Sequence, residues 1–157
     1  MAVSYIEVTR RRFPDQPPYQ WHESFDVPFS SLSKPLTQAK VALLSSGGVF
    51  HKNQEGFNPV KNDFTYRVIE KSTNPIDLHI LHDSYDHSGA KQDINCVFPY
   101  QRLQELEDKR VINQFSQRAF TFMGRIFSKT KLMQELVPAL LDELHADQVD
   151  AALLVPV

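Results

Sequence analysis

The stretch "KVALLSSGGVF", residues 40–50, decides the fold of this chain. Val41 to Leu44 form an uninterrupted apolar run, as expected of a strand that is buried on both faces. The Ser-Ser-Gly-Gly sequence that follows predicts a tight loop. A buried strand that ends in such a loop is typical of a parallel sheet in an α/β protein.

Further strands are expected downstream of this stretch. Their apolar and β-branched residues alternate or form short runs, and we predict them at 64–71 (FTYRVIEK), 77–82 (DLHILH), 117–124 (QRAFTFMG) and 149–157 (VDAALLVPV). The last of these is expected to be buried. Residues 94–98 (INCVF) form another short apolar run, which we expect to be a strand with Cys96 as a small core residue.

Two helices complete the pattern. One is expected to begin at Pro99, because proline is tolerated in the first turn and leucines follow at helical spacing. The other covers residues 132–144, where apolar residues recur every three or four positions and Pro138 predicts a kink. Strands alternating with helices predict a single α/β domain, residues 40–157, with a mostly parallel sheet flanked by helices.

Residues 1–39 differ from the rest of the chain. They are rich in proline, which removes amide donors and biases the preceding residue away from helix, so we expect an extended arm. This arm carries several aromatic residues that should pack against the domain or a second subunit, and it therefore predicts a homo-oligomer. The aromatic residues are Phe13, Tyr19, Trp21, Phe25 and Phe29.

The composition excludes several classes of protein. A net charge of -2 over 157 residues gives no electrostatic footprint for nucleic acid or an anionic membrane. A single cysteine excludes an internal disulfide framework and CxxC motifs. No secretory h-region is visible, and no apolar run approaches the roughly 20 residues that cross a bilayer. We therefore expect a cytoplasmic protein.

Candidate site residues follow the predicted strands, because ligands in open α/β sheets bind outside the carboxyl ends of the strands. This rule selects residues 45–51, residues 82–93 and the segment that ends at Val157. In the first of these, two glycines permit a nest of amides that can hold a carboxylate. An ordinary turn is the alternative. The residues of this predicted carboxylate holder are Ser45, Ser46, Gly47 and Gly48.

The second loop, "HDSYDHSG", supports three interpretations. His82 and His87 could bind a divalent metal together with an aspartate, although their spacing matches no established metal motif. A histidine and an aspartate could instead act as general acid and base. The third interpretation is structural, with Asp86 or Asp93 capping turns and His79 hydrogen-bonded inside the sheet.

A series of segments resembles the component B selenoprotein of glycine, sarcosine and betaine reductases and the related D-proline reductase subunit. The resemblance runs from about residue 18 to the end of the chain. It is carried by "PPYQW", "PLTQAKVALLSSGGVFHKNQEGFN", "FTYRVI", "DLHILHDSYDHSGAKQDINCVFP", "RLQELEDKRVI" and "FTFMG". The positions that match the family's pocket are Gly47, Gly48, His51, His82, Tyr85, Asp86, His87, Asp93 and Asn95.

The resemblance implies reductive cleavage of a carbon–nitrogen bond. In the family, a selenolate or thiolate attacks the α-carbon of a substrate held as a Schiff base on a companion pyruvoyl subunit. That nucleophile belongs to a short motif after a strand ending in a "PV"-like sequence, and the present 157 residues end at "LLVPV". We therefore expect that this chain alone does not complete the reaction, because no other side chain replaces the nucleophile at neutral pH.

The sequence leads to one principal functional hypothesis and two alternatives. The chain is expected to act on a small amino-acid-like or carboxylated substrate, with a partner subunit that carries a thiol. His51, His82 or His87 would be the acid–base groups, Asp86 their orienting partner, and Tyr85, Asp93 and Asn95 further substrate-binding residues. The alternatives are a non-catalytic assembly module and a metal-dependent enzyme that uses His82 and His87.

Overall fold

The computed structural model describes residues 5–12, 14–15, 25 and 29–157, and the chain divides into two units, residues 1–31 and 32–157. In the first unit, helix α1 (Tyr5–Arg12) has Glu7 in its first turn and three arginines in its last turn. These charges interact favourably with the helix dipole and stabilise the helix. Residues 5–12 are thus helical rather than extended. Of the aromatic residues predicted in the arm, Phe13, Tyr19 and Trp21 lie outside the described residues.

The second unit is an α/β domain, as predicted. Its strands are β1 (Lys40–Ser45), β2 (Val49–His51), β3 (Tyr66–Glu70), β4 (Leu78–Ile80), β5 (Gln114–Phe115), β6 (Arg118–Phe122) and β7 (Ala151–Val155). Its helices are α2 (Ser88–Gln92), α3 (Tyr100–Asp108), α4 (Lys129–Lys131) and α5 (Val137–Ala146). Its 3₁₀ turns are η1 (Leu36–Gln38), η2 (Pro75–Asp77) and η3 (Ile94–Cys96), and η4 (Leu132–Leu136) is a π-helical segment.

Strand β1 is the centre of the main sheet. It pairs in parallel with β5 near its start, with β6 near its end and with β7 along residues 41–45. Because β5 and β6 occupy one edge of β1, β7 occupies the other and is an edge strand. Strand β3 adds to β6 in antiparallel orientation, so the sheet is mostly parallel. Strands β2 and β4 form a separate antiparallel pair.

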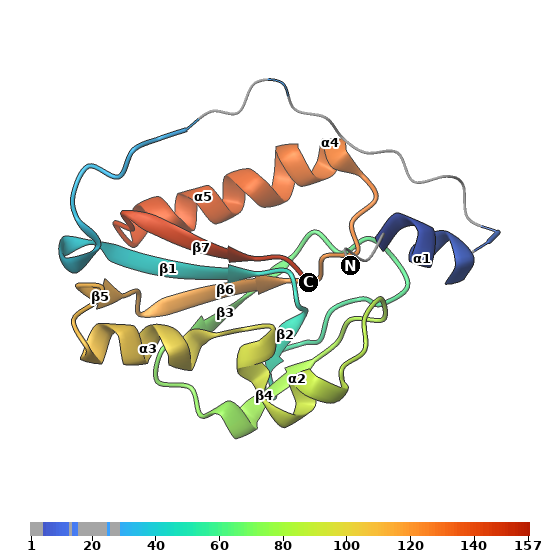
Figure 1. Ribbon diagram of the computed structural model, residues 1–157, viewed down its shortest axis with the longest axis horizontal. Helices are drawn as coiled ribbons and strands as arrows, with labels where there is room; N and C mark the ends of the chain where they lie inside the picture. Colours follow the sequence, from blue (N-terminus) through green and yellow to red (C-terminus); the bar gives the residue numbers. More distant parts are fainter. Residues whose placement is uncertain (1–4, 13, 16–24, 26–28) are drawn as a thin grey trace. The chain divides into compact units, whose positions relative to one another are not determined.

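Helices cover both faces of the sheet (Figure 1). Successive side chains of β1 point to opposite faces and so contribute to two different cores. Val41 and Leu43 contribute to a core on the face covered by α3. Ala42 and Leu44 contribute to a second core, which is covered by η4 and α5 through Leu136 and Leu140. The apolar run of β1 is therefore buried on both sides, as its sequence predicts.

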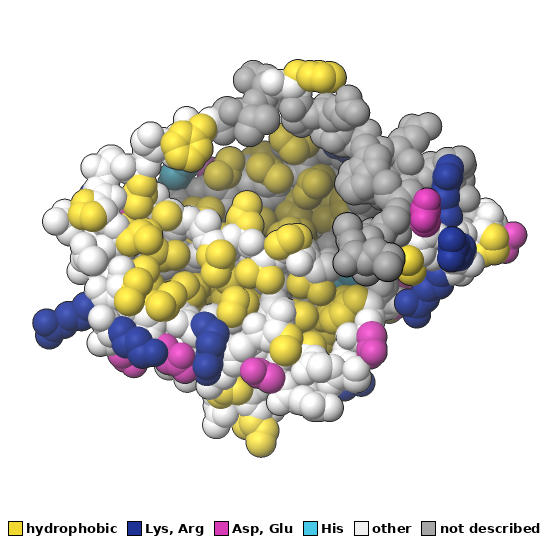
Figure 2. Space-filling view, in the orientation of Figure 1, with side chains coloured by type: hydrophobic (Ala, Val, Ile, Leu, Met, Phe, Trp, Pro, Cys, Tyr) yellow, Lys and Arg dark blue, Asp and Glu magenta, His cyan; other side chains and the backbone are white. Residues whose placement is uncertain are grey.

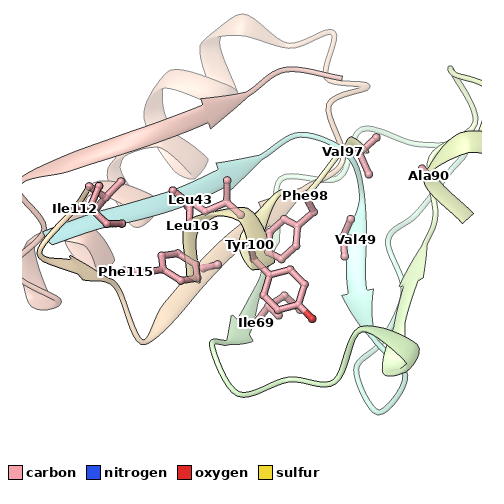
Figure 3. Close-up of a cluster of buried hydrophobic side chains, with 12 residues drawn as sticks. Leu43, Val49, Ile69, Ala90, Val97, Phe98, Tyr100, Leu103, Ile112 and Phe115 are labelled. Carbon is pink, nitrogen blue, oxygen red and sulfur yellow. The ribbon is translucent and has the colours of Figure 1, made fainter. Parts of the chain in front are cut away.

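The larger core lies under α3 (Figure 3). Phe98 and Tyr100 begin the segment that leads into this helix, and their rings lie 5.5 Å apart. They pack with Ile69 of β3 and Phe115 of β5, all of them buried. The hydroxyl of Tyr100 donates a hydrogen bond to the Thr73 carbonyl, 3.0 Å away, so this polar atom is satisfied at the margin of the core.

Several local predictions are corrected by the structure. Residues 94–96 form the turn η3 rather than a strand, and Cys96 is exposed rather than a core residue. Residues 49–51, predicted as loop, form β2 because they pair with β4. The helix predicted around Pro138 contains η4 directly before α5. Pro138 has no amide to donate one turn back, which favours the wider π-type turn there.

Candidate active site

The loop between β1 and β2 is tied firmly into the domain. Ser45 ends β1 fully buried, and its hydroxyl donates to the Val97 carbonyl over 2.6 Å. The same oxygen accepts a hydrogen bond from the Gly47 amide. Gly48 has a φ of +67°, a conformation that disfavours residues with a Cβ atom. The local sequence therefore builds a fixed turn at the carboxyl end of the central strand.

The amides of this loop already have partners within the protein. Four successive N–H groups donate to internal acceptors: Ser46 to the Val155 carbonyl, Gly47 to the Ser45 hydroxyl, Gly48 to the Phe122 carbonyl and Val49 to the Thr121 hydroxyl. The amide nest expected to hold a carboxylate is thus occupied by the fold itself. The loop instead joins the ends of β1, β6 and β7.

Three aromatic side chains cluster beside this loop. The rings of His82 and Tyr85 lie 5.0 Å apart, and those of Tyr85 and His87 lie 4.5 Å apart in an edge-on arrangement. The Tyr85 hydroxyl donates to the Gly47 carbonyl over 3.0 Å. Burial raises the pKa of Tyr85 to about 12, so this phenol stays protonated and keeps the cluster attached to the loop. We call these three residues the His–Tyr–His cluster.

His82 is a neutral, buried hydrogen-bond donor. Its side chain is buried, with the residue only 3% exposed, and its Nδ1 accepts a hydrogen bond from the Ser84 amide at 3.2 Å. The proton of the neutral ring therefore resides on Nε2. Burial lowers the pKa of His82 because it penalises the charged form, while nearby Asp83 acts in the opposite direction.

Two imidazole nitrogens of the cluster lack partners. Among the described residues, the buried side-chain nitrogens and oxygens without a hydrogen bond are Nε2 of His82 and Nε2 of His87. Unsatisfied buried polar atoms are rare, and each costs about 1–3 kcal/mol. Their occurrence together, in one cluster at the carboxyl edge of the sheet, marks this position as a candidate site.

Arg125, which follows β6, was not identified as a candidate site residue from the sequence. Arg125 Nε lies 3.8 Å from a carboxylate oxygen of Asp83, the residue that follows His82 in the chain. Its guanidinium also donates to the Val60 carbonyl at 3.0 Å and lies over the Phe127 ring. Its place just after a strand that ends at the carboxyl edge is the signal that could have identified it.

His51 lies apart from the cluster. It ends β2 at the opposite end from Gly48, where its Nδ1 accepts from the Asn53 amide and its Nε2 is 4.0 Å from Asp77. The pairing of Val49 with Ile80 carries the chain back toward Gly48, so His82 and His51 lie at opposite ends of the β2–β4 pair. The structure therefore does not bring the predicted acid–base candidates His51 and His87 together.

The remaining predicted residues stabilise turns. Asp86 accepts from the Ser88 amide at the start of α2. Asp93 accepts from both the backbone and the side-chain amide of Asn95, and these bonds lower its pKa. The predicted capping role of both aspartates is confirmed. His79 does not fit its predicted place inside the sheet, because it is exposed on β4.

A groove lies along β4, away from the cluster histidines. It has a volume of about 500 Å³ and is lined by residues of η2, β4 and α2, with His79, Lys91 and Asp93 among them. Neither His82 nor His87 lines it. Within the described part of the chain, no three histidine, cysteine, aspartate or glutamate side chains come close enough together to hold a metal ion. Among the described residues, His82 and His87 therefore have no third side chain with which to bind a metal ion.

The fold and the cluster define an α/β protein with a candidate site at the carboxyl edge of its sheet. Residues 16–157 match the family described as glycine/sarcosine/betaine reductase selenoprotein B, and the chain belongs to this family. The resemblance inferred from the sequence is thereby confirmed. None of the helices in the described ranges has the length and apolarity needed to cross a membrane.

The chain is also similar to a curated protein that is a subunit of another reductase. The chain is 30% identical over 141 residues to D-proline reductase subunit gamma of Acetoanaerobium sticklandii. The aligned region covers 90% of this chain and 54% of that protein, so the chain spans about half the length of its curated relative. No solved structure matches the chain. The chain is thus a relative of reductase subunits.

Proposed function

We propose that this chain is a reductase subunit that binds a small amino-acid-like or carboxylated substrate at the His–Tyr–His cluster. The observation that carries the proposal is the pair of buried Nε2 atoms without partners. A polar ligand that completes their hydrogen bonds would remove the cost of leaving them unpaired. Membership of the glycine/sarcosine/betaine reductase family supports an amino-acid-like group as that ligand.

His82 is proposed to hold the substrate. Its Nδ1 is occupied by the Ser84 amide and burial favours the neutral ring, so its Nε2 presents one fixed N–H. A donor of this kind binds a carboxylate or carbonyl oxygen without giving up its proton. Arg125, close to Asp83 at the same loop, is a nearby cation that can add to the attraction for a carboxylate.

His87 is proposed as the acid–base residue. Cleavage of a carbon–nitrogen bond leaves the electron pair of that bond on nitrogen, which must gain a proton. A protonated His87 would supply it through Nε2. The bond to carbon would be made by a selenolate or thiolate of a partner chain, which contributes both electrons of the new bond as the amine leaves. Asp86 fixes the turn that carries His87, because its carboxylate accepts a hydrogen bond from the Ser88 amide.

Histidine NMR tests this proposal directly. In protein labelled with 15N-histidine, glycine, sarcosine, betaine and D-proline are titrated separately, and the imidazole nitrogens are followed. We expect at least one of the four to shift the Nε2 signals of His82 and His87. A pH titration should also find His82 neutral, as the Nε2–H tautomer, below the ordinary histidine pKa of about 6.5.

Substitutions at the histidines provide the contrast. His82→Gln, at the residue proposed to hold the substrate, should abolish the ligand-induced shift at His87, whereas His51→Gln, at the far end of β2, should leave it intact. In the complete reductase, His87→Gln should lower turnover by about 100-fold or more, as for loss of a general acid. If none of the four ligands moves either cluster signal, or only His51 responds, the proposal fails.

A non-catalytic assembly module remains the second candidate function. The observation in its favour is that β7 exposes two leucines at the edge of the sheet. A stable complex with a partner chain, together with full turnover by the His87→Gln complex, would favour this role. The predicted homo-oligomer is tested separately by light scattering during gel filtration.

A further inference from the structure

Strand β4 has an edge to which no described strand is paired, and a groove runs along this strand. Strand β7 also has such an edge, where Leu153 and Leu154 are exposed although they were expected to be buried. Figure 2 shows hydrophobic and charged side chains reaching the surface together along the lower edge of the view, where Figure 1 places β4 and α2. A hollow that offers both kinds of contact is typical of a ligand site.

The backbone of Ile80 is available on the side of β4 that faces away from β2. In an antiparallel pair, residues that exchange hydrogen bonds alternate with residues that do not. The Leu81 amide donates to the Gly48 carbonyl, so the next pair, Val49 with Ile80, exchanges none. The Val49 amide accordingly donates to the Thr121 hydroxyl instead. The N–H and C=O of Ile80 therefore point away from β2, and Ile80 lines the groove.

This pair of backbone groups matches the two ends of an α-amino acid. In an antiparallel sheet, one residue binds another through both its N–H and its C=O group. An α-amino acid carries an acceptor and a donor on the same α-carbon. Its carboxylate can accept from the Ile80 amide while its ammonium group donates to the Ile80 carbonyl. A single amino acid can thus pair with Ile80 as one residue of a strand would.

Two opposite charges line the same groove without pairing with each other. Lys91 is exposed on α2, and its ammonium group has no partner among the described residues. Asp93 accepts both of its hydrogen bonds from Asn95 through Oδ1, which leaves Oδ2 without a partner in the described part of the chain. The groove therefore holds one cation for a carboxylate and one anion for an ammonium group, as a zwitterion requires.

The remaining wall of the groove is aliphatic. Leu78, Ile80 and Ile94 line it, and all three are half-buried side chains at the margin of the larger core. An aliphatic side chain placed there would cover apolar surface that the fold leaves exposed to water. The groove volume of about 500 Å³ lies within the roughly 300–1,000 Å³ of small-molecule sites.

We propose that this groove is a binding site for an α-amino acid with an aliphatic side chain, separate from the His–Tyr–His cluster. The Ile80 backbone holds its two ends, Lys91 and Asp93 select for the zwitterion, and the aliphatic wall selects for the side chain. Neither His82 nor His87 lines the groove, so its ligand does not occupy the position proposed for the substrate.

Titration of the full chain with L-leucine tests the inference. Calorimetry measures the affinity, and the amide signal of Ile80 in 15N-labelled protein reports the position of the ligand. We expect one saturable site and a shift at Ile80. Two analogues each lack one charge: 4-methylpentanoate has no ammonium group, and L-leucinamide has no carboxylate. Both should bind at least threefold more weakly than L-leucine.

Two substitutions identify which charge binds which end of the ligand. Lys91→Met should weaken L-leucine at least threefold and leave the affinity for L-leucinamide unchanged. Asp93→Asn, which keeps an oxygen to accept from Asn95, should weaken L-leucine to a similar extent and leave the affinity for 4-methylpentanoate unchanged. Lys129→Met is the matched control, because Lys129 is an exposed lysine on α4 that does not line the groove. Thermal melting checks that each variant is folded.

Several results would overturn the inference. They are the absence of saturable L-leucine binding, an affinity that neither substitution changes, and a response confined to the imidazoles of His82 and His87. Tighter binding of N-acetyl-L-leucine N-methylamide than of L-leucine would also overturn it, since this uncharged peptide unit would assign the edge of β4 to a strand of another polypeptide.

The two proposals fail in different ways. A response to L-leucine at Ile80, with no shift at His82 and His87 for any of the four substrate candidates, contradicts the proposed function alone. Ligand shifts at these histidines in a chain whose groove binds no L-leucine contradict the groove inference alone.

Discussion

Gly48 shows how much of the site depends on one residue. Its positive φ turns the chain between β1 and β2, and a methyl group there would collide with the Leu81 carbonyl oxygen. The close approach is mutual, because the Leu81 amide donates to the Gly48 carbonyl over 2.9 Å. His82 follows Leu81 directly, so the turn at Gly48 sets the position of the buried imidazole.

Gly48→Ala should therefore destabilise the protein. We expect a loss of at least about 2 kcal/mol in the free energy of unfolding, because the left-handed backbone and the collision both oppose a Cβ atom. Urea denaturation followed by circular dichroism measures it. Gly89→Ala is the control, since Gly89 lies on α2 with open space around it and alanine favours helix. Equal losses in the two variants would contradict this explanation.

At the residue scale, the sequence predicted the candidate site but not its geometry. The loop containing His82, Tyr85 and His87 was predicted from its polar density after a strand. The burial of His82 could not be predicted, because it depends on a contact between Tyr85 and Gly47, 38 residues apart. The position of His51 could not be predicted either. Its separation from His82 follows from the β2–β4 pairing, which a three-residue strand does not reveal in its sequence.

At the element scale, Arg118 fastens helix α5 to the sheet. From the start of β6 it forms ion pairs with Glu143 at 2.7 Å and Asp147 at 2.8 Å. The Tyr66 hydroxyl of β3 donates to Glu143 over 2.7 Å, so two strands hold one carboxylate. The Tyr66 bond, followed by the Arg118 bond, lowers the pKa of Glu143. The arrangement keeps the helix aligned over the core of Leu136 and Leu140.

Arg118→Met should loosen this attachment. We expect a loss of about 1–3 kcal/mol in the free energy of unfolding at pH 7, since two partly buried carboxylates lose a charged hydrogen-bond donor. Arg102→Met removes an exposed pair with Glu105 on α3 and should change stability by less than about 0.5 kcal/mol. Equilibrium urea unfolding distinguishes the two. A similar small effect for both would show that Arg118 is only a surface charge.

Longer elements were predicted more completely than short ones. The apolar run of β1, the alternation of β3 and the helical stripe before β7 are properties of four or more residues, and each was found near its predicted place. Turn η3 and strand β2 are three residues long, so their conformation is set by what they pack against. Strand β7 has a core-like sequence, and only the sheet order shows that one of its edges has no partner among the described strands.

At the scale of the whole molecule, the boundary of the domain is testable. The sequence predicts it at residue 39, whereas the contacts divide the chain after residue 31. Residues 32–39 are bonded to the second unit, because Lys34 pairs with Asp150 and the Leu36 carbonyl accepts from the Asn113 amide. Ala39 is fully buried. These contacts are expected to contribute to the stability of the α/β domain.

Two truncations separate these boundaries. A chain that begins at residue 32 should melt within about 2 °C of the full chain, whereas one that begins at residue 40 should melt at least about 5 °C lower, for a loss of 1–2 kcal/mol. Differential scanning calorimetry measures both. Equal melting temperatures for all three chains would place the boundary at residue 39. A clearly lower melting temperature for the chain that begins at residue 32 would show that residues 1–31 also stabilise the domain.

The central position of β1 also affects how the protein is made. Its partner β7 is synthesised long after it, since Lys40 and the Asp150 carboxylate that binds its amide are 110 residues apart. During translation, almost the whole domain must therefore be synthesised before the edge of β1 that binds β7 can be paired. Pairings of such long sequence separation fold slowly and leave aggregation-prone strands exposed meanwhile. We expect the nascent chain to depend on ribosome-associated chaperones until β7 has emerged.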